Sequence, residues 1–217
     1  MDQKKAATHS TKIRDEAFLW GNDVGDSYHG VAASHMDGQW SGLIWPVLSR
    51  YPIDYSNCLD LAAGYGRNTR KLLEAGAGHV YAVDINPDCI QQLKANFTDK
   101  RTTVIQNNGT EINGVADSSI SLFYTFDALV HFDYEIVISY MYEAFRVMRQ
   151  GSYAFIHHSN YTGNPGGDFR KNPHWRNFMS ALLFKHIAIK AGFEVIEQNN
   201  VVWGGADIDC ITVLKKP

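Results

Sequence analysis

The sequence has few cysteines and no long hydrophobic run, and each absence excludes a class of protein. Cys58, Cys89 and Cys210 are odd in number and far apart, so they form neither a disulfide framework nor a CxxC metal site. Cys58 and Cys210 lie in apolar runs, where a cysteine acts as a small buried hydrophobe. No stretch approaches the roughly 20 apolar residues of a membrane-spanning helix, and residues 1–16 lack the apolar core of a signal peptide. We therefore expect a cytoplasmic protein with no membrane partner.

The sequence also lacks a dense block of basic residues. It has 20 Lys and Arg against 23 Asp and Glu, a formal net charge of −3. Proteins that bind nucleic acid usually present a strongly basic patch or stripe. The composition therefore predicts no nucleic-acid partner, and it leaves open whether the protein is a monomer or a homodimer.

Strand-like and helical segments alternate through the chain after residue 50. Apolar runs typical of strands cover residues 57–62, 79–84, 102–106, 119–126 and 152–158, and helical spacing separates most of them. Two more strand-like runs, 193–197 and 210–214, follow each other without a helix between them. The pattern predicts an α/β fold: a three-layer α/β/α sandwich with a Rossmann-like, mainly parallel seven-stranded sheet and an antiparallel C-terminal hairpin. At 217 residues the chain suits a single domain.

Residues 59–68 have the pattern of a strand that turns sharply into a helix. Small residues at Ala62, Gly64 and Gly66 let a ligand approach the backbone closely. The N–H groups at the start of the helix then favour a polar or anionic ligand group. Asp84 follows at the tip of the next strand, where a carboxylate can accept two hydrogen bonds from a ribose diol. Together these residues predict a site for a nucleoside-containing cofactor.

Three details distinguish this pattern from a dinucleotide site. Asp60 lies in the first strand, where the dinucleotide fingerprint has apolar residues. Asn68 and Thr69 occupy the place of the last glycine in GxGxxG. The hairpin expected at the end of the chain is the third difference.

On these residues, the segment 55–215 resembles the class I S-adenosylmethionine-dependent methyltransferases. The family's first motif, an acidic residue and a small-residue GxG loop, matches Asp60 through Gly66 and runs into Arg67. Ala62 replaces the usual first glycine and is expected to crowd the methionine part of the cofactor slightly. The resemblance implies S-adenosyl-L-methionine as the cofactor and a methyltransferase domain over residues 51–217.

The resemblance also assigns the remaining cofactor contacts. Asp84 matches the ribose-binding acid, and Ile85 matches the apolar residue packed on adenine. Relatives usually place an Asp after the third strand to accept the adenine amino group. Here Asn108 is the choice over Asn107, and Gly109 or Thr110 would supply a backbone N–H. Phe126 ends the fourth strand, beside the expected position of the methyl donor.

Residues 1–50 are expected to form a helical lid region within the same domain. Aromatic side chains such as Trp20 and Tyr28 would shield the sulfonium from water and contact it through cation–π attraction. The alternative is that these rings merely cover an edge of the sheet.

Candidate catalytic residues follow strands four and five, because open α/β sheets bind ligands at the carboxyl ends of their strands. A methyl acceptor must be aligned with the donor, and a hydroxyl acceptor must also lose its proton. Asp127 and His131 follow strand four, and His157 and His158 end strand five. Alternation along the strand directs one of the last two histidines to the site. We choose His158 as general base, with His131 as the alternative.

A divalent cation held by Asp127, His131, His158 and a late acid such as Asp207 is a second arrangement of the same residues. These residues have no sequence-local ligand spacing. The sequence therefore predicts no metal site.

The acceptor is expected to be a small molecule. Methyltransferases that act on DNA amino groups or on protein glutamine often carry Asn/Asp-Pro-Pro-Tyr/Phe after strand four, and this chain has Thr-Phe-Asp-Ala there. The leading expectation is O-methylation of a sugar or natural-product hydroxyl. Cationic and histidine side chains in the loop 161–176 would suit a phosphate-bearing acceptor: Arg170, Lys171, His174 and Arg176. The alternatives are a small-amine N-methyltransferase and a catalytically silent cofactor-binding module.

Overall fold

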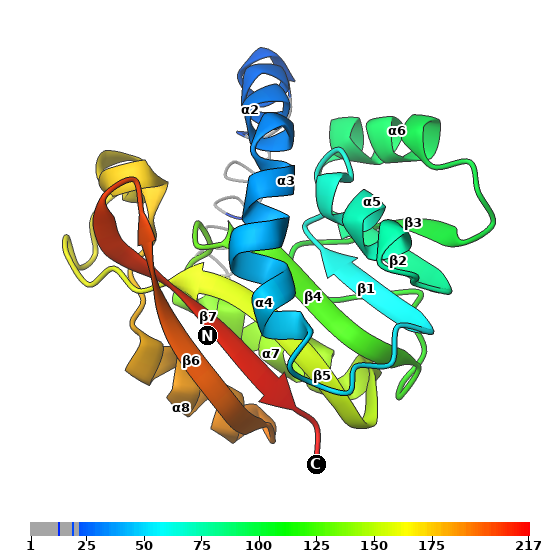
Figure 1. The fold of residues 1–217 in the computed structure, drawn as a ribbon. Helices are drawn as coiled ribbons and strands as arrows, with labels where there is room; N and C mark the ends of the chain where they lie inside the picture. The colour runs from blue at the N-terminus through cyan, green and yellow to red at the C-terminus, as the bar shows by residue number, and fades with distance from the viewer. Residues whose placement is uncertain (1–12, 14–18, 20–21) are drawn as a thin grey trace, which may run out of the picture.

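The computed structural model describes residues 13, 19 and 22–217, and it contains a seven-stranded sheet with helices on both faces (Figure 1). The strands are β1 (Asn57–Leu61), β2 (His79–Asp84), β3 (Thr102–Gln106), β4 (Ile120–Leu129), β5 (Met148–Ser159), β6 (Glu194–Trp203) and β7 (Ala206–Lys215). Their order across the sheet is β3-β2-β1-β4-β5-β7-β6. β1 to β5 run parallel to one another, whereas β7 is antiparallel to both β5 and β6. The predicted fold class is confirmed.

The helices alternate with the parallel strands as the sequence predicts. They are α5 (Arg67–Glu74), α6 (Pro87–Asn96), α7 (Tyr134–Val147) and α8 (Ala181–Ala191), with short 3-10 segments η2 (Phe169–Lys171) and η3 (Pro173–Trp175). Asn86 begins α6 as its N-cap and accepts a hydrogen bond from the Asp88 backbone N–H at 2.8 Å. Ser180 caps α8 in the same way, and Gly192 ends that helix in the left-handed conformation. Local sequence signals therefore determine where these helices begin and end.

An N-terminal column of helical segments stands against one face of the sheet (Figure 1). It consists of α2 (Asn22–Ser34), α3 (Met36–Gln39), the π-helical turn η1 (Trp40–Ile44) and α4 (Trp45–Leu48). Ile44, Val47 and Leu48 are buried in the apolar cluster on this face. The column is packed on the sheet over its lower half, so its upper half, α2, projects towards the carboxyl ends of the strands. A boundary at residue 50 between lid and main domain remains a prediction.

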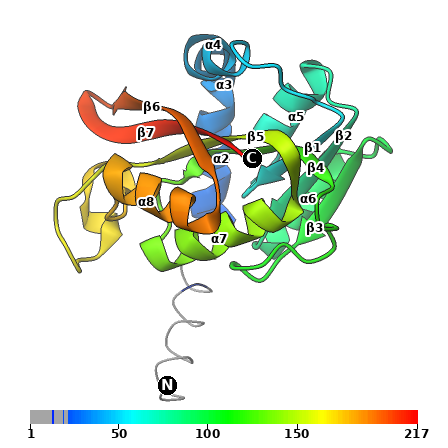
Figure 2. The same ribbon diagram turned by 90° about the horizontal axis from the view of Figure 1, so that it is seen from below.

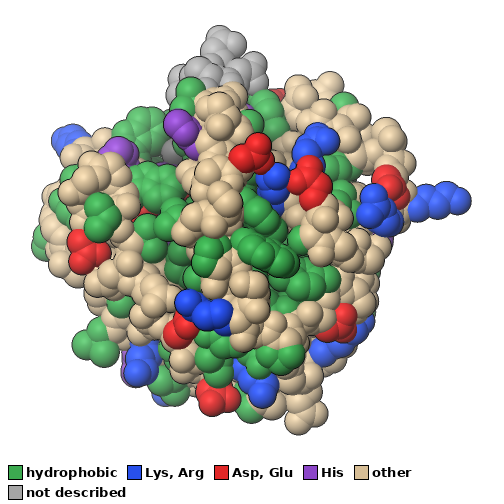
Figure 3. Space-filling model, viewed as in Figure 1, with side chains coloured by type: hydrophobic (Ala, Val, Ile, Leu, Met, Phe, Trp, Pro, Cys, Tyr) green, Lys and Arg blue, Asp and Glu red, His purple; other side chains and the backbone are tan. Residues whose placement is uncertain are grey.

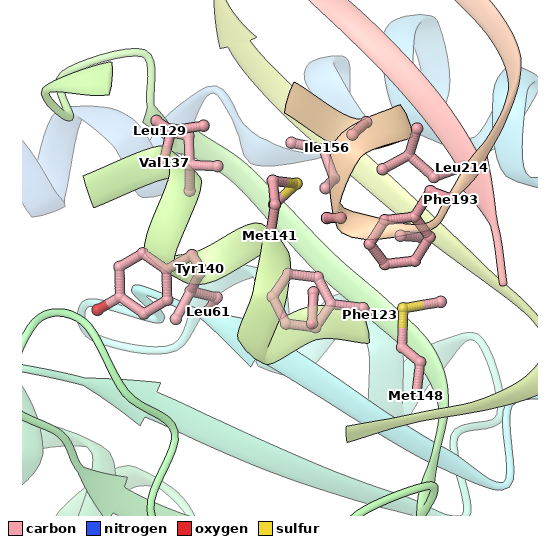
Figure 4. Close-up of a cluster of buried hydrophobic side chains, with 14 of the residues drawn as sticks. Leu61, Phe123, Leu129, Val137, Tyr140, Met141, Met148, Ile156, Phe193 and Leu214 are labelled. Atoms are coloured by element: carbon pink, nitrogen blue, oxygen red, sulfur yellow. The ribbon is translucent and has the colours of Figure 1, made fainter. Parts of the chain in front are cut away.

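Two apolar cores fill the space between the sheet and its helices. On one face α7 and α8 pack on the sheet, as the view in Figure 2 shows. Phe123, Met141 and Ile156 lie in the centre of this core and are fully buried (Figure 4). The other face carries η1, α4 and α5 on a second cluster that includes Tyr124 and Phe155. Both faces of the central strands are therefore covered, which matches their nearly continuous apolar sequences.

The three cysteines lie inside these layers. Cys58, Cys89 and Cys210 are buried and unbridged. Burial raises the pKa of the Cys58 thiol to about 12 and that of Cys210 to about 11. The expectation that cysteine serves here as a buried hydrophobe is consistent with these positions.

Among the helices of the described chain, none is both long and apolar enough to cross a bilayer. On the face drawn in Figure 3, acidic and basic side chains are interspersed, and hydrophobic side chains gather beside the N-terminal column.

The core makes a direct stability prediction. Phe123→Ala removes a fully buried ring and leaves a cavity, so the free energy of unfolding should fall by about 3–5 kcal/mol. Leu182→Ala on α8 is the control, because that side chain is 77% exposed and should change stability by less than about 0.5 kcal/mol. Urea unfolding followed by circular dichroism measures both, and equal effects would contradict this assignment of the core.

Candidate functional site

The turn from β1 into α5 has the shape of a ligand-binding loop. Ala62, Gly64 and Gly66 all have positive φ angles, of 57°, 56° and 90°. A Cβ added at Gly64 would lie 2.9 Å from the His29 ring, and one added at Gly66 would collide with the Phe97 ring. Both glycines are therefore required by backbone conformation and by close approach.

Ala62 departs from the family's glycine in backbone conformation as well as in size. Its left-handed φ is unfavourable for a residue with a Cβ. The neighbouring residue fixes the turn, because the Ala63 N–H donates to the Val83 carbonyl of β2 at 3.0 Å. The crowding predicted from the sequence is thus joined by backbone strain, which the sheet around the loop compensates.

Asp60 lies beneath this loop and is fully buried. Its Oδ2 accepts a 2.6 Å hydrogen bond from the Thr69 hydroxyl at the start of α5. Its Oδ1 has no hydrogen-bond partner among the described residues. Burial raises the pKa of this carboxyl to about 7, and the Thr69 bond only partly offsets that effect. Asp60 therefore tethers the helix to the strand and keeps one acceptor oxygen available beneath the loop.

Asp84 stands at the end of β2, beside the same loop. Its carboxylate accepts hydrogen bonds from the Gly64 N–H at 2.8 Å and from the Asn86 N–H at 2.9 Å. Burial raises its pKa, although these backbone donors work against that shift. Each carboxylate oxygen can accept a second hydrogen bond. The side chain lines a cavity of about 120 Å³, where a ribose diol could supply those donors.

The adenine end of the site differs from the sequence prediction. Ile85 and Gly109 line the cavity as expected. Asn108 instead has an exposed side chain that accepts hydrogen bonds from the backbone N–H groups of Thr110 and Glu111. It closes a local turn, which is the usual role of Asn in loops. The choice of Asn108, with Thr110 beside it, is therefore wrong for a contact that lines this cavity.

Asn107 is the better-placed amide. It is buried, and its Nδ2 donates to the Tyr140 hydroxyl at 2.8 Å. Its Oδ1 has no partner among the described residues, and Tyr140 itself lines the cavity. A buried amide oxygen without a donor is costly, so this atom fits an exocyclic amino group better than Asn108 does.

The residues around this cavity come from both halves of the chain. The cavity has a volume of about 120 Å³. Besides the cofactor residues already named, it is lined by Tyr28, His29, Asp127, Ala128, His131, Phe132, Ile136 and Phe169. The described volume is smaller than the several hundred Å³ usual for cofactor pockets. Tyr28 and His29 of α2 form one wall, and the His29 ring stacks on Tyr65 with 3.9 Å between ring centroids.

A second cavity of about 730 Å³ lies on the other side of α2. Arg67 and Phe126, both expected at the cofactor, line this second cavity. Tyr28 and Asp127 line both cavities, so α2 separates two parts of one larger depression. Trp20, the other predicted lid residue, lies outside the described residues.

Asp127 is the centre of a buried polar network. The backbone ladder between β4 and β5 is interrupted between Thr125 and Leu129, and Asp127 has a positive φ of 58°. Its Oδ2 accepts hydrogen bonds from Arg67 Nη2 at 2.8 Å and from the Tyr28 hydroxyl at 2.9 Å. Burial alone would raise its pKa, but Arg67 above all outweighs it, and the pKa lies below the usual range. Asp127 is therefore an anion that joins α2, α5 and β4.

Arg176 and Asp209 extend the network towards the C-terminal hairpin. Arg176 Nε and Nη2 bind the two oxygens of Asp209 at 2.7 and 2.6 Å, and Nη2 lies 3.7 Å from Asp127 Oδ1. His157 Nδ1 accepts from the Asp127 N–H at 3.1 Å, so its Nε2 carries the proton and donates to Asp209 at 3.1 Å. All of these side chains are buried. The expectation that Arg176 faces an acceptor in the loop is therefore not what the structure shows.

The structure places His158 away from the cavity, contrary to the sequence prediction. It is fully buried on the α8 face of the sheet and stacks on Phe184 with 3.8 Å between centroids. Both ring nitrogens are occupied, one near the Ser159 carbonyl and one near the Thr212 hydroxyl, each at 2.8 Å. Burial lowers its pKa to about 3. The choice of His158 as general base is wrong, because strand alternation directs this ring away from the cavity.

His131, unlike His158, lines the 120 Å³ cavity, together with His29 of α2. Its Nδ1 lies 2.8 Å from the Trp175 carbonyl oxygen. A carbonyl can only accept, so Nδ1 carries the proton of the neutral ring and Nε2 is the basic nitrogen. Burial, together with the charge of Arg176, lowers its pKa to about 4. His131 is therefore neutral near pH 7.

The residues of the alternative metal site do not converge. His158 lies on the opposite face of the sheet from Asp127, and Asp207 is exposed on the hairpin. Within residues 13, 19 and 22–217 there is no group of three His, Cys, Asp or Glu side chains placed to hold an ion.

Several site residues escaped the sequence reasoning. His29 and Asp209 were not named from the sequence, and Arg176 was named only as a possible acceptor contact in its loop. The contacts of all three join distant segments of the chain. Asn107 was weighed and passed over, and burial of the residue was the missing information. The glycine loop, Asp60 and Asp84 were found because their contacts are close in sequence.

The described residues fit S-adenosylmethionine. The glycine loop gives a backbone surface for the methionine part, and Asp84 offers acceptors to a ribose. Ile85 and Gly109 give an apolar surface beside the unpartnered oxygen of Asn107, where an adenine amino group would fit. Asp60 has a second unpartnered acceptor beneath the loop.

Comparison with known proteins supports this assignment. Residues 58–151 match a family model described as a methyltransferase domain, and no curated protein sequence matches the chain. The fold is similar to that of a solved S-adenosylmethionine-dependent methyltransferase from Leishmania major, with 13% identity, 95% of this chain and 82% of that chain covered, and a TM-score of 0.73. It is also similar to that of an S-adenosylmethionine-dependent methyltransferase from Mesorhizobium loti. The two chains are 14% identical, the comparison covers 79% of this chain and 96% of that chain, and the TM-score is 0.64. A geranyl diphosphate methyltransferase is 9% identical, with 75% of this chain and 72% of that chain covered and a TM-score of 0.60.

The matched segment begins in β1 and contains the glycine loop, Asp84 and Asp127. The structural similarity extends beyond that segment to the antiparallel strands at the end of the chain. Identities this low establish the fold and leave the acceptor open. Residues 58–151 thus match a methyltransferase-domain model, and the chain has the fold of the class I S-adenosylmethionine-dependent methyltransferases.

Proposed function

We propose that this enzyme methylates a hydroxyl group of a small molecule, such as a sugar or another natural product, and that His131 accepts the hydroxyl proton. The observation that carries the proposal is the presence of a neutral, buried histidine in the same cavity as Asp84, Gly64 and Ile85. A neutral imidazole suits a proton acceptor. His131 thus replaces His158 in the role that the sequence suggested.

When bound, S-adenosylmethionine supplies a methyl group already activated by its positively charged sulfur. The protein must therefore align the acceptor oxygen and receive its proton. That proton becomes strongly acidic as the oxygen forms its new bond, so a weak base such as His131 is sufficient. The anionic Asp127 lies near enough to favour the protonated ring, and the Trp175 carbonyl holds its orientation.

A small amine is the second candidate acceptor, because Asp127 also lines the cavity and could attract a cation. Two arginines already neutralise that carboxylate, which weakens this attraction. The third reading, a silent cofactor-binding module, predicts cofactor binding without transfer. Carbon-13 NMR after incubation with methyl-labelled cofactor and a panel of methyl glycosides, phenols and small amines separates the three, because O-methyl and N-methyl carbons resonate at different shifts.

Binding of the cofactor itself is tested at Asp84. Asp84→Asn replaces an anionic acceptor by an amide, so the affinity for S-adenosylmethionine should fall by about 10- to 100-fold. Isothermal titration calorimetry measures the change. Asp99→Asn is the control, since Asp99 is exposed and paired only with Arg101 beside it. No heat with the unaltered protein, or equal affinity for both variants, would contradict the assigned cofactor site.

The catalytic role is tested at His131. His131→Ala should reduce kcat on the best acceptor of the panel by on the order of 100-fold or more, while cofactor affinity stays within a few-fold. His186→Ala provides the matched control, because that histidine is exposed on α8. A loss of cofactor binding as large as the loss of turnover would show a structural role for His131 instead.

The pH dependence follows from the lowered pKa of His131, which is about 4. The ring is neutral above that pH, so kcat should stay nearly constant from pH 8 down to about 5.5, where an ordinary histidine of pKa about 6.5 would already be protonated. A fall in rate with a midpoint near pH 6.5 would contradict the assignment.

Protein stability must be followed in the same pH series. His131 and His158 have folded-state pKa values of about 4 and about 3, below 6.5, so the unfolded chain binds more protons between about pH 6.5 and 3. Their contribution to stability is therefore complete above that window and is lost as the pH falls through it. Circular dichroism at each pH shows whether the folded state persists.

A further inference from the structure

A groove of about 800 Å³ lies between the start of α7 and the loop that follows β5. It is beside the 120 Å³ cavity that His131 lines, which is called the active-site cavity below. The described residues that form it include Asp133 and Tyr134 at the start of α7 and Asn164, Asp168, Arg170 and Phe178 in the loop. Its volume is within the range of small-molecule sites. The groove uses none of the cofactor-binding residues.

The groove is directly connected with the residues that hold the proposed base. Phe169 lines both the groove and the active-site cavity, so one ring separates the two. Asn177, which also lines the groove, donates from its backbone N–H to the Val130 carbonyl at 2.9 Å and from Nδ2 to the His131 carbonyl at 3.2 Å. Residues 131 to 134 span at most about 10 Å. The groove therefore adjoins the segment that carries His131.

The side chains of the groove combine flat rings with short polar groups. Tyr134 is 41% exposed, and it accompanies Phe169 and Phe178. Asn164, Asn172 and Asn177 add amides. Each Nδ2 already donates one hydrogen bond within the protein, to Asn172 Oδ1, the Arg176 carbonyl and the His131 carbonyl respectively. An amide group has a second donor hydrogen and a second acceptor lone pair, which a ligand could use. A sugar presents an apolar C–H face together with hydroxyls that donate and accept. Aromatic rings can pack against the C–H face of a sugar, and amides can form hydrogen bonds with its hydroxyls.

The charge of the groove argues against a phosphate group. Among the described lining residues there are two carboxylates, Asp133 and Asp168, and one guanidinium, Arg170, which gives a net charge of −1. Arg170 is held by Asp168 through Nε at 2.9 Å and Nη2 at 2.8 Å. Arg176, the other arginine of the loop, is buried against Asp209. Of the cations that suggested a phosphate-bearing acceptor, Arg170 and Arg176 are thus paired within the protein, and Lys171 does not line the groove.

We propose that this groove is the acceptor subsite and that it binds a neutral sugar or an amino sugar without a phosphate, with Tyr134 stacked on the sugar ring. The inference rests on the proposed small-molecule methyltransferase function and names its substrate class. A sugar bound there places its distal hydroxyls past Phe169, towards His131 and the cofactor.

Saturation-transfer NMR on the full-length protein, with S-adenosylhomocysteine present, tests the proposal. The probes are the methyl glycosides of glucose, galactose, mannose, rhamnose and glucosamine, and UDP-glucose is the phosphate-bearing competitor. We expect at least one glycoside to bind, and UDP-glucose to bind no more tightly than that glycoside. Tyr134→Ala should weaken glycoside binding by about 5- to 10-fold, the size of one lost ring contact.

Tyr142→Ala is the matched control. Tyr142 lies on the same helix, is 52% exposed and does not line the groove, so this change should leave glycoside binding unaltered. If no glycoside binds, or if Tyr134→Ala and Tyr142→Ala behave alike, the proposal is wrong. It is also wrong if UDP-glucose binds more tightly and Arg170→Ala removes that binding, because the groove would then hold a phosphate.

Calorimetry with S-adenosylhomocysteine on the same samples distinguishes the two levels of inference. Cofactor-product binding without glycoside binding overturns the acceptor subsite and leaves the methyltransferase assignment intact. Absence of binding by both ligands would overturn the proposed function itself.

Discussion

The carboxylate of Asp127 is the interaction on which the arrangement of the site depends. It lies at the irregular end of β4 and accepts hydrogen bonds from Arg67 at the start of α5 and from Tyr28 on α2. One oxygen atom thus joins the central strand, the helix after the glycine loop and the N-terminal column. Removing one partner of such a buried pair leaves an uncompensated charge, which is far more costly than the pair is stabilising. The three segments are therefore constrained to one relative position.

The same network explains why Arg176, in the loop after β5, does not face a ligand. Asp209 and Arg176 are buried, and the side chains of Asp127 and Arg67 are only 7% and 13% exposed. The two carboxylates and the two guanidinium groups balance in charge. His157 bridges the two acids, because its Nδ1 accepts from the Asp127 N–H and its Nε2 lies 3.1 Å from Asp209 Oδ2. β7 is essential here, since its antiparallel course brings Asp209 opposite Ser159 at the end of β5. The antiparallel hairpin that distinguishes this fold from dinucleotide-binding sheets therefore also supports the active site.

The sequence predicted the fold and the cofactor loop well because those features depend on neighbours along the chain. The glycine turn, Asp84 and the alternation of strands and helices each follow from local conformational rules. The prediction was wrong where it depended on which face of the sheet a side chain lies on. Alternation separates His157 from His158 but does not tell which of them faces α8. Asn108 was chosen over Asn107 for the same reason, since burial of Asn107 arises from packing against Tyr140 on α7. The Arg176–Asp209 pair joins residues 33 apart and has no local signal.

The burial of all three cysteines has a practical consequence for chemical labelling. Thiolates are the reactive form of cysteine, and burial raises the pKa of each of these thiols. Maleimide reagents should therefore leave the folded protein unmodified. A cysteine introduced at an exposed position of α2, such as Val31, would be the single reactive thiol of the chain. A fluorophore attached there would report movements of α2 over the cavity without first removing any native cysteine.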